Sequence, residues 1–491
     1  MMSAYARRTA RKLTQQDLLY ESLRRAILDG DIGEGTRLAS SRALAEQLGI
    51  ARNSVLYAYE RLVEEGFVTA TRHGSIVNAV THGGAAPQAH ANAARTSGGG
   101  PALSRRVSDL PPRRGSGDGA IALRPGVPAL DAFPFVQWRT SIERSMRRLR
   151  ANDMGYGDSA GHPALRQAIA QYVRVSRGVR CRPDQVFITD GTQSSLDLCA
   201  RLFADQGERV WIENPGYLGA RVALQAAGLQ LVPVSVDAAG MAPGADDWED
   251  APPRLVYLTP SHQYPLGGVL SLERRLALIE HARACGAWIV EDDYDSELRH
   301  GGPPLPSIQG LADDTPVVYL GTFSKTMFPA LRIGFMVVPA GVARPVAKAI
   351  GALWRQGRVA EQMALAEFIE SGRYARHLRR MRKLYEQRRD GLVAAIGRHL
   401  PGIVTVSAGA GGMHLSVRLD APLRDVDVSE AARAHGLHLS PLSAYCLGAP
   451  DIDITRYNGF LLGYAEAPPP VADTLMATLA RVVRAMLDGG V

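Results

Sequence analysis

A segment with few large apolar side chains divides this chain and limits what it can fold into. Between Thr81 and Asp118 the sequence consists mainly of Gly, Ala, Ser, Pro and Arg. Such a segment buries too little apolar surface to offset its ordering entropy. The total of 491 residues also exceeds what a single hydrophobic core supports. We therefore expect two folded modules, residues 1–80 and 119–491, joined by a flexible linker over residues 81–118.

Composition and charge exclude several classes of protein. No apolar stretch approaches the roughly 20 residues that a membrane span needs, so we expect a cytoplasmic protein without membrane contact. The four cysteines form no C-x-x-C pair, which argues against a disulfide framework and against a zinc site. Residues 1–118 contain 16 basic and 11 acidic side chains, a balance that suits a polyanionic partner.

The first module shows three helix-period segments and a possible hairpin. Apolar residues recur at helical spacing from Leu19 to Ile27, and Ser41 is expected to cap a second helix with an apolar face of Leu44, Ala45 and Leu48. A third helix would turn Val55, Ala58, Tyr59 and Leu62 inward, and residues 67–77 would form the hairpin. This order predicts a winged helix-turn-helix domain.

Polar residues at the start of the third helix indicate a nucleic-acid contact. Arg52, Asn53 and Ser54 lie off the apolar face, where they could bond phosphates and base edges in a major groove. A three-helix module of this size could instead dock another protein. The segments 35–42 and 48–55 closely resemble the DNA-binding domain of the GntR family of bacterial repressors. That resemblance implies DNA contacts by Arg42, Arg52, Asn53 and Ser54, with His73 and Gly74 of the wing at the minor groove. Ala39 departs from the proline usual in the family.

The second module alternates strand-like apolar runs with helical segments, which predicts an α/β fold with a largely parallel sheet and a smaller α+β subdomain after about residue 395. The expected strands are 186–188, 210–212, 255–258, 288–290 and 317–320. Each run leads into polar or glycine residues, and ligands of such sheets bind beyond the carboxyl ends of the strands. Several polar clusters should therefore meet at one edge of the sheet.

Lys325 follows the last of these strands in a Gly-Thr-Phe-Ser-Lys-Thr loop, in a chain with only four lysines. A lysine can form a Schiff base, whereas an arginine cannot. Asp292 and Tyr294 follow the preceding strand, where a buried carboxylate could hold a pyridine nitrogen protonated and a hydroxyl could bond the ring oxygen. Asp292, Asp293 and Asp295 are equally plausible Mg²⁺ ligands.

Further groups suit a phosphate and a flat ring. Gly191 and Thr192 lie at an expected helix start, where free backbone N–H groups bind anions, and Arg332 adds a guanidinium. Tyr217 supplies an aromatic ring. His262 either lines the same pocket or has a structural role.

In combination and in this order, these groups describe a pyridoxal 5′-phosphate site, and residues 119–491 resemble a fold-type I aminotransferase. The whole chain resembles the MocR subfamily of GntR regulators. The resemblance implies that Lys325 holds the cofactor covalently and that Asp292, Tyr294 and Tyr217 contact its ring. It further implies phosphate contacts by Gly191, Thr192, Thr322, Ser324 and Arg332, and a homodimer in which Tyr156 reaches the neighbouring subunit's phosphate.

Two departures argue against efficient transamination. Catalytic members carry an asparagine where this chain has Tyr264, and the nearest candidate for their carboxylate-binding arginine is Arg456. A basic run from Arg373 to Arg389 is expected to form one long helix with a solvated face, although it could be a second DNA surface. We therefore expect a regulator that binds an operator and senses a small amine, an amino acid or the cofactor itself. The alternatives are a working aminotransferase with an attached DNA-binding module and a DNA-binding protein with a decayed domain.

Overall fold

The computed structural model describes residues 14–72, 74–79, 104–108, 110, 122–300, 305–407, 411–448 and 454–489. The chain divides into two compact units, Met1–Ala102 and Leu103–Val491, and the boundary falls in the expected linker. Most of that linker lies outside the described residues, apart from the one-turn helix α5 (Arg105–Ser108). None of the described helices is long and apolar enough to cross a bilayer.

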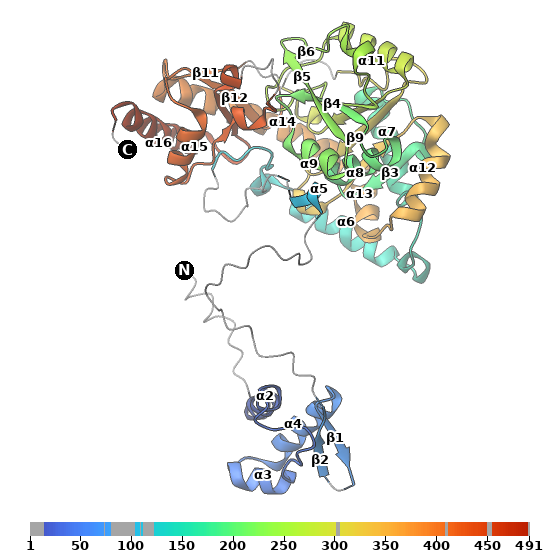
Figure 1. The fold of residues 1–491 in the computed structure, drawn as a ribbon, viewed down its shortest axis with the longest axis vertical. Helices are drawn as coiled ribbons and strands as arrows, with labels where there is room; N and C mark the ends of the chain where they lie inside the picture. The colour runs from blue at the N-terminus through green and yellow to red at the C-terminus, as the bar shows by residue number, and fades with distance from the viewer. Residues whose placement is uncertain are drawn as a thin grey trace. The chain divides into compact units, whose positions relative to one another are not determined.

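The described residues of the first unit form three helices followed by a two-stranded wing (Figure 1). Its elements are α2 (Gln15–Leu28), α3 (Ser41–Leu48), α4 (Arg52–Glu64), β1 (Val68–Thr71) and β2 (Gly74–Val77). The predicted inward residues of α4, Val55, Ala58, Tyr59 and Leu62, are buried as expected. Two details of the prediction are wrong. The cap of α3 is Ser40, whose hydroxyl accepts from the Ala43 amide, and Leu48 is about half exposed rather than part of the core.

The second unit is built on an eight-stranded sheet of order β3-β10-β9-β8-β7-β4-β5-β6. Strands β5, β4, β7, β8 and β9 are parallel to one another, whereas β10 runs antiparallel between β3 and β9, and β6 is antiparallel to β5. The strands are β3 (Val186–Thr189), β4 (Arg209–Asn214), β5 (Gln230–Asp237), β6 (Gly240–Met241), β7 (Leu255–Leu258), β8 (Trp288–Asp293), β9 (Val317–Thr322) and β10 (Gly334–Val337). All five predicted strands are present.

Helices cover both faces of this sheet because its strands are apolar on both sides. One face packs against α8 (Thr192–Phe203), α9 (Leu218–Ala226) and α12 (Ala340–Leu353). The opposite face packs in part against α11 (Leu272–Cys285) and in part against α7 (Pro163–Arg177) and α13 (Val359–Glu370). The remaining helices of this part are α6 (Phe135–Arg148) and α10 (Asp247–Asp250).

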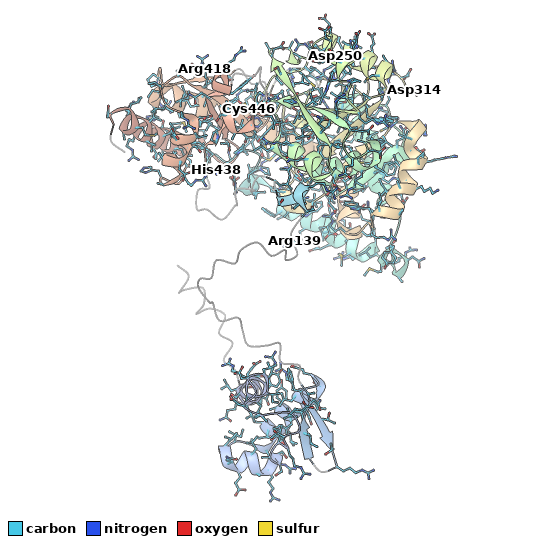
Figure 2. All side chains as sticks on the ribbon, viewed as in Figure 1. Arg139, Asp250, Asp314, Arg418, His438 and Cys446 are labelled. Atoms are coloured by element: carbon cyan, nitrogen blue, oxygen red, sulfur yellow. The ribbon has the colours of Figure 1, made fainter. Side chains whose placement is uncertain are left out.

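A smaller α+β subdomain completes the second unit, as predicted, and is coloured orange to red in Figure 1. Its antiparallel sheet has the order β11-β12-β14-β13. The elements are α14 (Arg373–His399), β11 (Val404–Val406), β12 (His414–Leu419), α15 (Asp425–Arg433), β13 (Ser440–Pro441), β14 (Gly459–Gly463) and α16 (Pro469–Leu487). Figure 2 labels Arg418 on β12 and Cys446. The next residue, Leu447, accepts a hydrogen bond at its carbonyl oxygen from the Asn214 side chain of β4. The two subdomains are therefore in direct contact.

The 3₁₀ turns, η1 to η7, connect these elements. They span Leu130–Ala132, Ala151–Met154, Pro183–Gln185, Ser296–Leu298, Pro329–Leu331, Leu442–Tyr445 and Ile454–Tyr457. The basic run does form the long helix α14, but its face is not wholly solvated. Arg388 is buried and bonds Asp131 and the carbonyl of Ala465.

Candidate functional site

The alternation of side chains along β8 separates its acidic residues. Successive residues of a strand point to opposite faces, so Asp292 shares the α8 and α9 face with Val290, while Asp293 points to the other face. There Asp293 accepts from Arg177 Nε at 2.6 Å and from the Tyr319 hydroxyl at 2.5 Å. Across the described part of the chain, no group of three or more His, Cys, Asp or Glu residues is arranged to hold a metal ion. The magnesium alternative therefore finds no support in this geometry.

Only one of the two oxygens of the buried Asp292 carboxyl accepts a hydrogen bond from a described residue. The Tyr257 hydroxyl, on the neighbouring strand β7, donates to Asp292 Oδ2 at 2.8 Å. Within the described residues, Asp292 Oδ1 has no hydrogen-bond partner. Burial raises the pKa of Asp292 to about 7, and Asp293 adds to this, while the Tyr257 hydrogen bond and the Lys325 charge oppose it. A protonated nitrogen facing Oδ1 would satisfy that oxygen and favour its ionised form.

Lys325 lies within electrostatic range of Asp292, because its charge lowers the Asp292 pKa. Its Nζ donates to the carbonyl oxygen of Gly126 at 2.8 Å. Gly126 has φ of +79°, and a Cβ there would lie 2.7 Å from Lys325 Nζ. The segment Ala122–Pro134, here named the strap, therefore passes over the lysine, and only a glycine permits that approach.

The start of α8 and the turn after β9 offer groups for an anion. Gly191 is the N-cap of α8 with φ of +97°, and no described side chain caps this helix start. Arg332 lies beside it, since a Cβ on Gly191 would be 3.6 Å from the Arg332 Nη1. Thr192 opens the helix and leaves first-turn N–H groups available for a phosphate. Among the turn residues, the Thr322 hydroxyl accepts from the Ser324 amide at 3.2 Å.

Aromatic rings surround Tyr264, which stands where catalytic relatives carry asparagine. Its ring is 5.5 Å from that of Tyr217, 5.8 Å from that of Tyr294 and 5.5 Å from that of Tyr445, all edge to face. The Tyr294 hydroxyl donates to the carbonyl oxygen of His262, and it also lies 3.0 Å from the His262 Nδ1. That same nitrogen lies 2.9 Å from Asp295 Oδ2. His262 is therefore buried in a hydrogen-bonded cluster beside the predicted site. This position is compatible with both expected roles of His262, lining the pocket and structural hydrogen bonding.

Two predicted residues lie apart from this cluster. Tyr156 is 79% exposed, and the Arg355 guanidinium lies over its ring, 6.0 Å from the ring centre. Arg456 belongs to the turn η7 and is exposed. The structure does not bring either of them to Lys325.

The groups present match the parts of pyridoxal phosphate. Asp292 suits the ring nitrogen, Lys325 the carbonyl carbon, Tyr217 the ring face, and the α8 start with Arg332 the phosphate. The sequence reasoning missed two residues of this arrangement, Tyr257 and Gly126. Tyr257 could have been found, because strand alternation places it on the same face as Asp292. Gly126 reaches the site from 199 residues before Lys325 in the chain.

The predicted DNA-contacting residues gather at the start of α3 and α4. Arg42, Arg52 and Asn53 are exposed, and Arg52 Nε donates to the Ser41 hydroxyl at 3.3 Å. Ser54 is half-buried, and Gly74 lies in the wing near the Arg37 side chain. His73 lies outside the described residues.

The departure at Ala39 is compensated locally. The Tyr59 hydroxyl of α4 donates to the carbonyl oxygen of Ala39 at 2.8 Å. This bond holds the turn in which the family usually carries proline.

Comparisons with known proteins agree with both halves of this description. Residues 15–77 match the family of bacterial regulatory proteins of the gntR type, and residues 126–452 match aminotransferase class I and II. The chain is 41% identical to the probable rhizopine catabolism regulatory protein MocR of Rhizobium meliloti, over 92% of this chain and 90% of that protein. It is 34% identical to the pyridoxine biosynthesis regulator PdxR of Corynebacterium glutamicum, over 96% of each.

A solved structure shows what this fold holds in a relative. The α-aminoadipate aminotransferase LysN of Thermus thermophilus, complexed with N-(5′-phosphopyridoxyl)-L-leucine, is 27% identical with a TM-score of 0.67 and covers 78% of this chain and 96% of that one. The expected cofactor, pyridoxal phosphate, is confirmed at the level of the family. The chain belongs to the MocR group of GntR-family transcriptional regulators, in which a helix-turn-helix domain precedes an aminotransferase class I and II domain.

Proposed function

We propose that this regulator senses a small amine through pyridoxal phosphate bound at Lys325, and that its second unit supports little or no transaminase turnover. The observation that carries the proposal is the buried Asp292 with one unpartnered oxygen beside the Lys325 amine. Bound pyridoxal phosphate supplies a carbonyl carbon that exchanges one primary amine for another. The chain's own residues then determine which amines gain access.

Each residue of the site has a distinct task in this proposal. Lys325 would hold the cofactor covalently, and its primary amine is the group that an effector amine would replace. Asp292, oriented by Tyr257, holds the proton on the ring nitrogen. Gly191, Thr192, Thr322, Ser324 and Arg332 bind the phosphate, and Tyr217 packs on the ring. Tyr294 and His262 line the ring-oxygen side.

Low turnover is supported by Tyr264 and Arg456. Tyr264 replaces an asparagine of catalytic relatives with a larger group that is packed among other rings. Arg456 is exposed on η7 and is not brought to Lys325, so it is not placed to bind the carboxylate of an amino-acid substrate there. The test is steady-state production of a keto acid from amino donors and 2-oxoglutarate, which we expect to be undetectable while amines still change the visible spectrum.

We further propose that the protein acts as a homodimer. Tyr156, Met154 and Met146 expose large side chains, as do Phe135 and Val136 of α6, and such groupings mark interaction surfaces. In this assembly Tyr156 of one subunit would bond the phosphate in the other. Effector binding would then shift the balance between two dimer arrangements that present the helix-turn-helix domains differently to operator half-sites.

Substitution of Lys325 tests the sensor directly. Lys325→Ala should abolish both borohydride-stable attachment of the cofactor and the effector response, because no other residue of the site carries a primary amine. Binding of operator DNA without effector should persist. Loss of that basal binding would show that the cofactor is structural, and protein that purifies colourless and is unaffected by borohydride would reject cofactor binding altogether.

A further inference from the structure

His414 is a buried imidazole beside the candidate site for which the functions proposed above have no use. It is the first residue of β12 and is only 4% exposed. Its ring lies nearly parallel to that of His262, with centres 5.0 Å apart, and edge-on to Tyr264 at 5.3 Å. In the part of the chain that the structure describes, its Nε2 has no hydrogen-bond partner. A buried polar atom left unpaired costs about 1–3 kcal/mol, so this one requires an explanation.

Two observations place His414 near Lys325, whose charge also acts on the imidazole. Gly412, two residues earlier, permits the approach, because a Cβ there would lie 2.4 Å from the His262 ring. Gly463 pairs with His414 in the sheet and contacts the strap that covers Lys325. His414 thus lies where the two subdomains and the strap meet around the reactive amine.

The imidazole of His414 and the phenol hydroxyl of Tyr264 beside it are neutral. Burial, reinforced by the charges of His262 and Lys325, holds the pKa of His414 well below its usual value, so the imidazole carries no charge near neutral pH. The hydroxyls of Tyr264 and Tyr445 lie 3.4 Å apart in the same cluster. A neutral imidazole nitrogen donates in one tautomer and accepts in the other, and a phenol hydroxyl does both.

This chemistry discriminates between classes of amine. A hydroxyl on the effector can donate or accept, so it matches a neutral imidazole nitrogen in either tautomer. A carboxylate would be repelled by the Asp295 carboxyl, which lies 2.9 Å from the Nδ1 of the His262 ring on which His414 stacks. A plain alkyl amine would leave Nε2 unpaired.

We propose that His414 is a specificity-determining residue that hydrogen-bonds the effector and selects hydroxylated amines over carboxylated or plain alkyl amines. This inference rests on the proposed function, since it assumes that an amine reaches the cofactor at Lys325.

The test uses the full-length, cofactor-loaded protein and three sets of probes of two to six carbons: amino alcohols, ω-amino acids and alkyl amines. Spectral titration should give the lowest apparent Kd for an amino alcohol, about 10-fold or more below the alkyl amine of equal length. His414→Phe keeps a ring against His262 and should abolish this preference without changing the response to alkyl amines. His414→Gln, which places an amide near the position of Nε2, should restore part of it.

The outcomes separate this inference from the function on which it rests. Tightest binding of an ω-amino acid, or a preference for amino alcohols that survives in His414→Phe, would overturn the role of His414. An equal loss of response to all three sets in His414→Phe would also overturn it, because that pattern indicates a structural role. A wild-type protein that carries the cofactor at Lys325 but responds to no amine would instead refute the amine-sensing function.

Discussion

The Tyr257→Phe substitution tests the proposal that Asp292 contacts the ring nitrogen of the cofactor. It removes one oxygen and leaves a ring of nearly the same volume in the core. Among the described residues, that oxygen is the only hydrogen-bond donor to the Asp292 carboxyl, at 2.8 Å. A hydrogen bond to a charged group contributes about 1.5–3 kcal/mol. Since one pKa unit corresponds to about 1.4 kcal/mol, the pKa of Asp292 should rise by about one to two units above its present value of about 7.

The sign of the effect on stability follows from this shift. A carboxyl whose pKa is raised on folding is best tolerated when protonated, so the cofactor-free protein loses stability as pH rises from the unfolded value of about 4 through about 7. Without the Tyr257 hydroxyl the charged form is tolerated still less. Urea unfolding should show that the destabilisation by Tyr257→Phe grows by about 1.5–3 kcal/mol between pH 6 and pH 9. The affinity for pyridoxal phosphate at pH 7.5 should fall about 10- to 100-fold.

Tyr319→Phe is the matched control. Tyr319 lies in β9, which is adjacent to β8 in the sheet. Its hydroxyl donates to the carboxyl of Asp293, and that carboxyl also accepts from Arg177. Because Asp293 keeps its ion pair with Arg177, this variant should lose stability to a similar degree at pH 6 and pH 9. Its affinity for the cofactor should change little. Equal pH profiles in the two variants, or an unchanged cofactor affinity in Tyr257→Phe, would refute the assignment of Asp292 to the ring nitrogen.

Two further substitutions test the strap and the DNA surface. Gly126→Ala forces a φ of +79° on alanine, which costs about 1–2 kcal/mol, and places a methyl group 2.7 Å from the Lys325 Nζ. Borohydride trapping of the cofactor at Lys325 should therefore slow at least 10-fold. The control Gly341→Ala, which has open space around its Cβ, should have no effect on trapping. In gel-shift titrations, Arg52→Ala should cost about 1–3 kcal/mol of operator affinity and relax specificity at one base pair if Arg52 reads a base. A uniform loss of affinity with a shallower salt dependence would instead assign Arg52 to a phosphate contact. Arg25 is an exposed arginine of α2, so Arg25→Ala controls for the change in net charge.

The sequence predicted the elements and most of the edge where the candidate site lies, because both depend on local patterns. Apolar runs located the strands, and the polar residues after them located Gly191, Asp292 and Lys325. The cap of α3 was missed by one residue, a local error, whereas a larger error came from a contact between distant residues. Arg388 looked like part of a solvated basic face, but it is buried on a carboxylate 257 residues earlier in the chain. Periodicity along a helix cannot reveal what another segment places against it.

The strap shows why such contacts matter for a fused regulator. It is the first continuous described segment after the expected linker, and its Gly126 carbonyl accepts from Lys325. Its other bonds go to the small subdomain, from the Gly463 amide to the Leu123 oxygen and from the His438 amide to the Ala122 oxygen. Coupling between two sites requires that a ligand at one change the free energy of an element shared with the other. Under the proposed function, an amine that replaces Lys325 would also change the contact of Lys325 with the strap, and the strap is the segment that follows the linker.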